Sequence, residues 1–121
     1  MTLTTDGRNA ACNGFVDFLN TGTIVFETVG NSEVATCTFP SPAFGDAAVG
    51  VATAGTIVDD TSATGGVITH AHLKKSDTTD MASCTCTVTG GGGDFLLTSL
   101  TIGAGDTVSV TSLTVTQPAG P

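Results

Sequence analysis

Most of this chain alternates apolar and polar residues in short segments, a pattern that predicts β-strands. The segments are rich in Thr, Val and Ile, and they are separated by Gly, Asp, Asn, Ser or Pro. β-branched residues suit a pleated sheet, and turn residues at such intervals are typical of all-β folds. We expect strands at residues 23–28, 33–39, 49–54, 67–74, 81–88, 95–101 and 107–116.

The first part of the chain has the spacing of a helix instead. In segment 4–21, the apolar residues recur at intervals of three and four and share one broad face. We expect Thr5 or Asp6 to cap its N-terminus and Asn20-Thr21-Gly22 to end it. Because Gly14 weakens the helix, docking of the apolar face should stabilise it. That face consists of Ala11, Cys12, Phe15, Val16, Phe18 and Leu19.

These elements predict a mainly β protein, either an antiparallel β-sandwich or a jelly-roll-like barrel with one N-terminal α-helix. A chain of 121 residues is long enough for one domain with a core. We expect a single domain at 1–121, divided into the helix at 4–21, the sandwich at 22–117 and a tail at 118–121.

The last predicted strand changes its phase. Val108 and Val110 share one face, whereas Leu113 and Val115 have the opposite parity. The change at Thr111–Ser112 predicts either a β-bulge or a strand that passes from one packing environment to another.

Two prolines interrupt the pattern after residue 39. Pro40 and Pro42 cannot donate to a sheet ladder, so the preceding strand should end at Phe39. Phe39 and Phe44 should then be buried and anchor an excursion from the sheet. We interpret the segment as a corner of the sandwich. The alternative is a partner-contact loop formed by Phe39, Pro40, Pro42 and Phe44.

A pair of histidines and a pair of cysteines raise the question of a zinc site. An antiparallel hairpin that places the apolar residues of both strands on one face puts Lys74 opposite Met81 and Ala71 opposite Cys84. This register turns Cys84 and Cys86 inward and His70 and His72 outward. Zinc needs all its ligands around one centre, so the four residues cannot share an ion. We therefore expect a structural hairpin and no metal site.

Disulfide formation between Cys84 and Cys86 is also disfavoured. Their Cβ atoms would lie about 6.6 Å apart along an extended strand, whereas a disulfide needs about 3.8 Å. We expect free thiols.

Other candidate sites are weak. Asp59-Asp60 lies in a Thr/Gly-rich segment, where a solvated turn is favoured over calcium binding because the ligand spacing of a calcium loop is missing. Gly90–Gly93 resembles a phosphate-binding loop, yet no Lys-Ser/Thr and no helical pattern follow it. No catalytic motif is recognisable. We predict no catalytic residues, no cofactor and no enzymatic activity.

Composition narrows the classes of partner. Three basic residues stand against eleven acidic ones, giving a net charge of −8, which argues against binding to nucleic acid or anionic lipid. Charged residues make up only 12% of the chain, compared with roughly 25% in ordinary soluble domains. A surface of Thr, Ser and Ala is easy to desolvate, and it indicates a protein that packs against others. We find no signal peptide or membrane span in the sequence, so we expect synthesis in a cytoplasm.

Three segments resemble a family of small virion structural proteins of tailed bacteriophages. They are "GRNAACNGFVDFLNTG", "TCTFPSPAFGDAAVGVATAGTI" and "GDTVSVTSLTVTQPAGP", and together they cover about half of the chain. Proteins of this family share an N-terminal helix, an "F..PAFG" turn and a Thr/Val-rich terminal strand. The sequence departs from the family at 69–73, where His and Ala stand in place of an aromatic residue and an Arg.

The resemblance implies a non-enzymatic β protein of the virion, made in the host cytoplasm. The favoured role is a capsid decoration, or cement, protein that binds the major capsid protein and itself, with a trimer as first expectation. Alternatives within the virion are a tail tube protein, a head-tail connector or another tail-associated protein. The alternative of another class is a soluble or secreted β-sandwich binding or adhesion module. That class should expose aromatic residues to its ligand, yet this chain has no Trp, no Tyr and six Phe.

Overall fold

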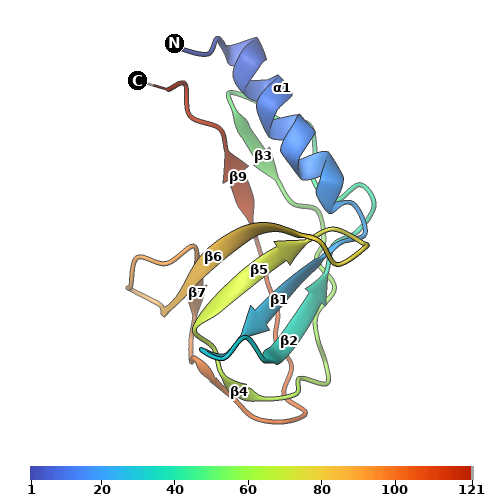
Figure 1. Cartoon of the computed structure of the whole chain (residues 1–121), viewed down its shortest axis with the longest axis vertical. Helices are drawn as coiled ribbons and strands as arrows, with labels where there is room; N and C mark the ends of the chain where they lie inside the picture. Colours follow the sequence, from blue (N-terminus) through green and yellow to red (C-terminus); the bar gives the residue numbers. More distant parts are fainter. Residues whose placement is uncertain (121) are drawn as a thin grey trace.

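A curled five-stranded sheet forms the body of the protein, and a helix with a two-stranded ribbon extends from it as an arm (Figure 1). The structure is a computed structural model that describes residues 1–120. The strand order in the main sheet is β2-β1-β5-β6-β7, and the pairs β3-β9 and β4-β8 form two small sheets. The elements are α1 (Thr5–Val16), a 3-10 turn η1 (Asp17–Leu19), β1 (Thr23–Glu27), β2 (Glu33–Thr38), β3 (Val51–Thr53), β4 (Gly66–Val67), β5 (His70–Lys74), β6 (Asp80–Val88), β7 (Phe95–Leu97), β8 (Thr101–Ile102) and β9 (Thr114–Thr116).

The core lies on one face of the main sheet. Side chains alternate between the two faces of a strand, and in β1 the buried residues Ile24 and Phe26 point into the core. Ile24 pairs with Leu73 of β5, and Phe26 pairs with Ala71. All four residues are at most 3% exposed. The alternating pattern of the sequence therefore separates a dry face from a polar one, as expected.

One strand pair departs from the expected antiparallel arrangement. β7 runs parallel to β6, with Cys86 opposite Phe95. Parallel strands normally need a connection of a dozen or more residues, yet here the chain doubles back through the glycines at 90–93. Thr85 and Asp94 hold the return, because each donates its backbone N–H to a side-chain oxygen of the other, at 3.0 and 2.9 Å. The glycine-rich segment, which the sequence suggested as a flexible loop, thus forms a tight connection between β6 and β7.

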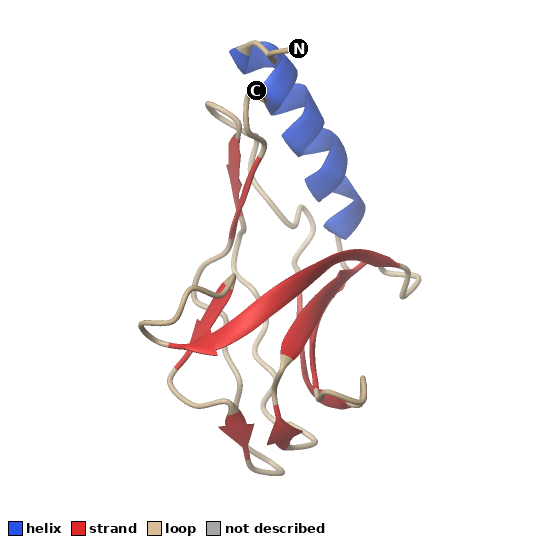
Figure 2. Ribbon diagram, turned by 60° about the vertical axis from the view of Figure 1, so that its left-hand side comes forward, coloured by secondary structure: helices blue, strands red, loops and turns tan. Residues whose placement is uncertain are grey.

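The arm consists of α1 and the β3-β9 ribbon, and Figures 1 and 2 show it rising from one end of the sheet. Polar side chains of α1 bind backbone groups of the ribbon and of the turn before it. Asn9 Oδ1 accepts the N–H of Gly50 at 2.7 Å, and Asn13 Oδ1 accepts that of Ala47 at 2.8 Å. Arg8 Nε donates to the carbonyl of Gln117 at 2.9 Å.

Both ends of the helix differ from the prediction. Its N-cap is Thr4, whose Oγ1 accepts the N–H of Gly7 at 3.1 Å, so neither Thr5 nor Asp6 caps it. The α-helix ends at Val16 and tightens into η1 before Gly22 leads into β1. A side chain at Gly22 would lie 2.1 Å from the carbonyl oxygen of Lys74, and this close approach requires glycine.

The expected apolar face of the helix is only partly buried. Cys12, Val16 and Leu19 are buried, whereas Ala11 is exposed and Phe18 is 57% exposed. The reason is that α1 seats against the ribbon with the side that carries Asn9, Cys12 and Asn13. Polar bonds to the backbone take the place of apolar packing there.

Several predicted strands are shorter or divided, and segment 49–54 keeps only the three residues of β3. Segment 67–74 splits into β4 and β5, and segment 95–101 splits into β7 and β8. Segment 107–116 keeps only β9, because Val108 forms an isolated bridge with Asp60 in the body while β9 pairs with β3 in the arm. The phase change at Thr111–Ser112 therefore marks a passage between two packing environments.

The fold is mainly β with one N-terminal helix among residues 1–120, and its strands form curled sheets like those of a half-barrel or sandwich. This confirms the predicted fold class. Within the same residues, no helix has the length and apolar character needed to cross a bilayer.

Candidate functional site

The polar face of the main sheet carries a cluster of one carboxylate and two imidazoles. β1 supplies Glu27, and the neighbouring strand β5 supplies His70 and His72. Glu27 pairs directly with His70, and Val25 pairs with His72. Because residues i and i+2 of a strand point to the same face, both imidazoles stand on the side of Glu27, away from the core. We refer to Glu27, His70 and His72 as the Glu-His-His cluster.

Glu27 is unusually buried for a carboxylate, at 8% exposed. It lies at a register shift between Phe26 and Glu27 in the β1-β2 pairing. Its backbone carbonyl accepts the N–H of Thr69 at 2.9 Å, so the strand end is held on the β5 side as well. A buried carboxylate is costly unless it is paired, and the two histidines supply that pairing.

The two imidazoles converge on one carboxylate oxygen. His70 Nε2 lies 3.0 Å from Glu27 Oε1, and His72 Nε2 lies 3.7 Å from the same atom. The two rings are tilted by 45° with their centroids 5.2 Å apart. The outer ring nitrogens face other groups: His70 Nδ1 lies 2.8 Å from Thr69 Oγ1, and His72 Nδ1 lies 3.1 Å from Asp80 Oδ2.

Lys74 forms an ion pair with Asp80 next to the Glu-His-His cluster. Lys74 Nζ lies 2.9 Å from Asp80 Oδ1. The hydrogen bond from Lys74 is the main cause that holds the pKa of the Asp80 carboxyl below its usual value. Asp80 therefore stays ionised next to His72 over the ordinary pH range.

The predicted separation of histidines and cysteines is confirmed. Ala71 pairs with Cys84 and His72 pairs with Ser83, as the apolar pattern required. A register shift after Leu73 places Lys74 opposite Asp80, so the expected pairing of Lys74 with Met81 was wrong. The bulge adds one residue to β6 next to the turn. The pairs further along the hairpin keep their register, so the histidines and the cysteines still point to opposite faces of the sheet.

The cysteines lie on the core side of the sheet. Cys86 is buried and Cys84 is half-buried, and burial raises the pKa of Cys84 to about 11 and that of Cys86 to about 12. Thiols with such pKa values are poor nucleophiles and poor metal ligands at neutral pH. All four cysteines are free, as expected.

Sequence reasoning missed Glu27 as a partner of the histidines. It compared the strand of His70 and His72 only with the next strand along the chain, whereas Glu27 lies 43 positions before His70. The available signal was local: an acidic residue ends the otherwise apolar run "TIVFE", where a buried charge needs a partner.

The two phenylalanines of the corner at residues 39–44 are buried, as expected. Phe39 is 2% exposed and Phe44 is 5% exposed, and their ring centroids lie 5.5 Å apart. Pro40 is half-buried and Pro42 is exposed. β2 ends at Thr38, one residue earlier than expected, because the N–H of Phe39 bonds to the carbonyl of Gly22. Contact of this corner with a partner stays a prediction.

Asp60 acts as a turn-forming residue. Its two carboxylate oxygens accept the N–H groups of Thr36 and Ser62, at 2.8 and 2.9 Å. These bonds use the oxygens that a calcium ion would need, and they favour the structural role over the calcium alternative.

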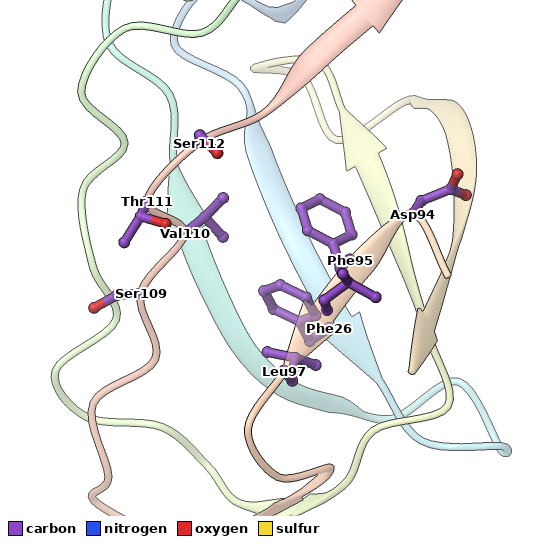
Figure 3. Close-up of a pocket in the computed structure, with 9 residues that line it drawn as sticks. Phe26, Asp94, Phe95, Leu97, Ser109, Val110, Thr111 and Ser112 are labelled. Atoms are coloured by element: carbon purple, nitrogen blue, oxygen red, sulfur yellow. The ribbon is translucent and has the colours of Figure 1, made fainter. Parts of the chain in front are cut away.

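A shallow pocket opens where the main sheet ends at β7. Its volume is about 320 Å³, and the 109–112 segment forms its opposite wall. Figure 3 shows Val110 reaching toward Phe26 and Phe95, whose rings meet edge to face with centroids 5.3 Å apart. The pocket lies on the core side of the sheet and contains none of the three residues of the Glu-His-His cluster.

Comparison with known proteins yields no match to a protein family, to a curated protein or to a solved structure. The resemblance to phage virion proteins therefore stays a prediction.

Proposed function

We propose that this protein is a non-enzymatic structural component of a phage virion, and specifically a capsid decoration protein. The observation that carries the proposal is the scarcity of charge, at 12% of residues compared with roughly 25% in ordinary soluble domains. Because few charges need to be desolvated, such a surface can be covered by other subunits at low cost.

Large apolar side chains at exposed positions support the same role. Val29 is 85% exposed in the turn after β1, and Val49 is 64% exposed in the turn before β3. Phe18 is 57% exposed at the foot of the arm. Each of these side chains would bury apolar surface if a neighbouring subunit covered it.

A decoration protein would stabilise a capsid by linkage. A ligand that binds the assembled shell and not its separated subunits stabilises the shell by RT ln(1 + [L]/Kd). A symmetric oligomer, with a trimer as the first expectation, would engage several copies of the major capsid protein and gain effective concentration. The protein would be made in the host cytoplasm and act in the virion.

The test compares phage particles with and without this protein. Particles that lack it should assemble and then burst at lower temperature than complete particles, and added protein should restore their stability. Labelled protein found only along the tail would contradict the capsid role and favour a tail protein. Equally stable heads without tails would point to a connector.

A further inference from the structure

We propose that the Glu-His-His cluster binds one divalent transition-metal ion, with zinc as the best match. One carboxylate oxygen of Glu27 and one ring nitrogen each from His70 and His72 lie within 4.8 Å of one another. This site differs from the His-Cys site that the sequence excluded, and it departs from the expectation of no metal site. It is also independent of the proposed virion role.

The distances between the ligand atoms fit a tetrahedral ion. Zinc binds imidazole nitrogen and carboxylate oxygen at about 2.0–2.2 Å, so two ligand atoms of one tetrahedron lie about 3.3 Å apart. The Nε2 atoms of His70 and His72 lie 3.0 and 3.7 Å from Glu27 Oε1, on either side of that value. All three ligand atoms lie within 4.8 Å of one another, so rotation of the side chains would bring them to bonding distance around one ion.

The outer ring nitrogens have the partners that metal-binding histidines usually have. In metal sites the second nitrogen of each imidazole donates to an oxygen, which orients the ring and selects its tautomer. Thr69 Oγ1 lies 2.8 Å from His70 Nδ1, and Asp80 Oδ2 lies 3.1 Å from His72 Nδ1.

His72 approaches Asp80 closely without forming a hydrogen bond to it. His72 Nδ1 is buried and has no hydrogen bond of acceptable angle, although the Asp80 oxygen is within reach. Turning the ring toward a bound ion would allow this carboxylate-imidazole hydrogen bond to align. Alignment of that bond would satisfy the one buried side-chain polar atom that, within residues 1–120, has no hydrogen-bond partner.

The charge of Glu27 also favours a cation. Its carboxylate is buried, and the contacts described for its side chain within residues 1–120 are with the two histidines. The nearest lysine on this face, Lys74, is paired with Asp80. A divalent ion bound between the carboxylate and the two imidazoles would add a full positive charge next to the buried Glu27.

Two imidazoles and one carboxylate suit zinc and other borderline transition metals, and do not suit calcium or magnesium, which require oxygen ligands. Three protein ligands leave a fourth position for water. The ligands come from two neighbouring strands, so the ion would link β1 to β5 and stabilise the main sheet.

The experiment titrates the full chain, first treated with a chelator, with Zn²⁺ and with Co²⁺ as a spectroscopic probe. We expect one ion per chain by calorimetry and a rise in the unfolding temperature on adding Zn²⁺. The Co²⁺ spectrum should lack thiolate charge-transfer bands. These two histidines are the only ones in the chain, so both imidazole NMR signals should respond to the ion.

Variants test each ligand in turn. His70→Gln, His72→Gln and Glu27→Gln should each abolish saturable binding, and Asp80→Asn should weaken it about 10- to 100-fold, as loss of an orienting carboxylate usually does. The matched control is Asp6→Asn, which removes a carboxylate from the first turn of α1 in the arm and should leave the affinity unchanged.

Three results would overturn the proposal. The first is no saturable binding by the unaltered chain, and the second is binding that survives loss of both histidines. The third is a Co²⁺ spectrum with thiolate bands, which would assign the ion to cysteines. Should a variant fail to fold, the imidazole NMR signals of the unaltered chain decide the question, because unchanged signals at saturating Zn²⁺ exclude the site.

Discussion

The body and the arm of this protein are held together by different interactions. In the body, β1, β2 and β5 pack Ile24, Phe26 and Leu73 into an apolar core. In the arm, α1 buries Cys12 and Val16 and binds backbone groups through polar side chains: Cys12 Sγ donates to the carbonyl of Val115, and Asn9 and Asn13 accept backbone N–H groups. Burial of apolar area stabilises more strongly than hydrogen bonds exchanged with water. The arm should therefore open before the body does.

The largest expected effect lies in the body. Phe26 is fully buried and meets Phe95 edge to face, so Phe26→Ala should lower the free energy of unfolding by about 3–5 kcal/mol. Urea denaturation followed by far-UV circular dichroism measures the change. A loss below about 1 kcal/mol would show that the body has no tightly packed core.

A smaller and more local effect is expected in the arm. Asn9→Ala leaves the buried N–H of Gly50 without its acceptor, which costs about 1–3 kcal/mol. Hydrogen exchange should accelerate in α1, β3 and β9 and stay unchanged in β1 and β5. Equal acceleration in both regions would mean that arm and body unfold as one unit.

Two glycines of the arm should respond to the same substitution with opposite sign. Gly14 lies in the helix, with no atom within 4 Å of an added Cβ, so Gly14→Ala should stabilise by up to about 1 kcal/mol. Gly50 has a φ of +75°, and its Cβ would lie 2.6 Å from Arg8 Nε, so Gly50→Ala should destabilise. Thermal unfolding of both variants measures the two changes in unfolding temperature. Equal changes would contradict the packing of α1 against the turn before β3.

An effect confined to alkaline pH concerns the two thiols on the core side of the main sheet. Burial raises the pKa of Cys84 to about 11 and that of Cys86 to about 12, so unfolded chains lose these protons first as the pH rises. The resulting stabilisation is complete below about pH 9 and is lost between there and pH 12. Unfolding curves from pH 8 to 11 should show the decline, and Cys84→Ala with Cys86→Ala should reduce it. A decline of unchanged size in that double variant would assign it to other groups.

The pattern of apolar and polar residues along the chain predicted much of the body and less of the arm. The register of Ala71 with Cys84 followed from placing apolar residues on one face, and Pro40 predicted the end of β2 to within one residue. The helix face was predicted less well, because Asn9 and Asn13 look like solvent-exposed residues until their backbone partners are known. A hydrogen bond to a distant amide leaves no periodic signal in the sequence.

The sequence by itself determined where the strands lie, which residues face the core, and that His70 and His72 stand opposite to Cys84 and Cys86. Those properties depend on the two-residue repeat of a strand and on burial of its apolar side, whatever the neighbouring strand is. Only the tertiary structure decided that β1 lies beside β5, and hence that Glu27 meets both histidines. Strand order depends on packing between segments distant along the chain, and no local pattern encodes it.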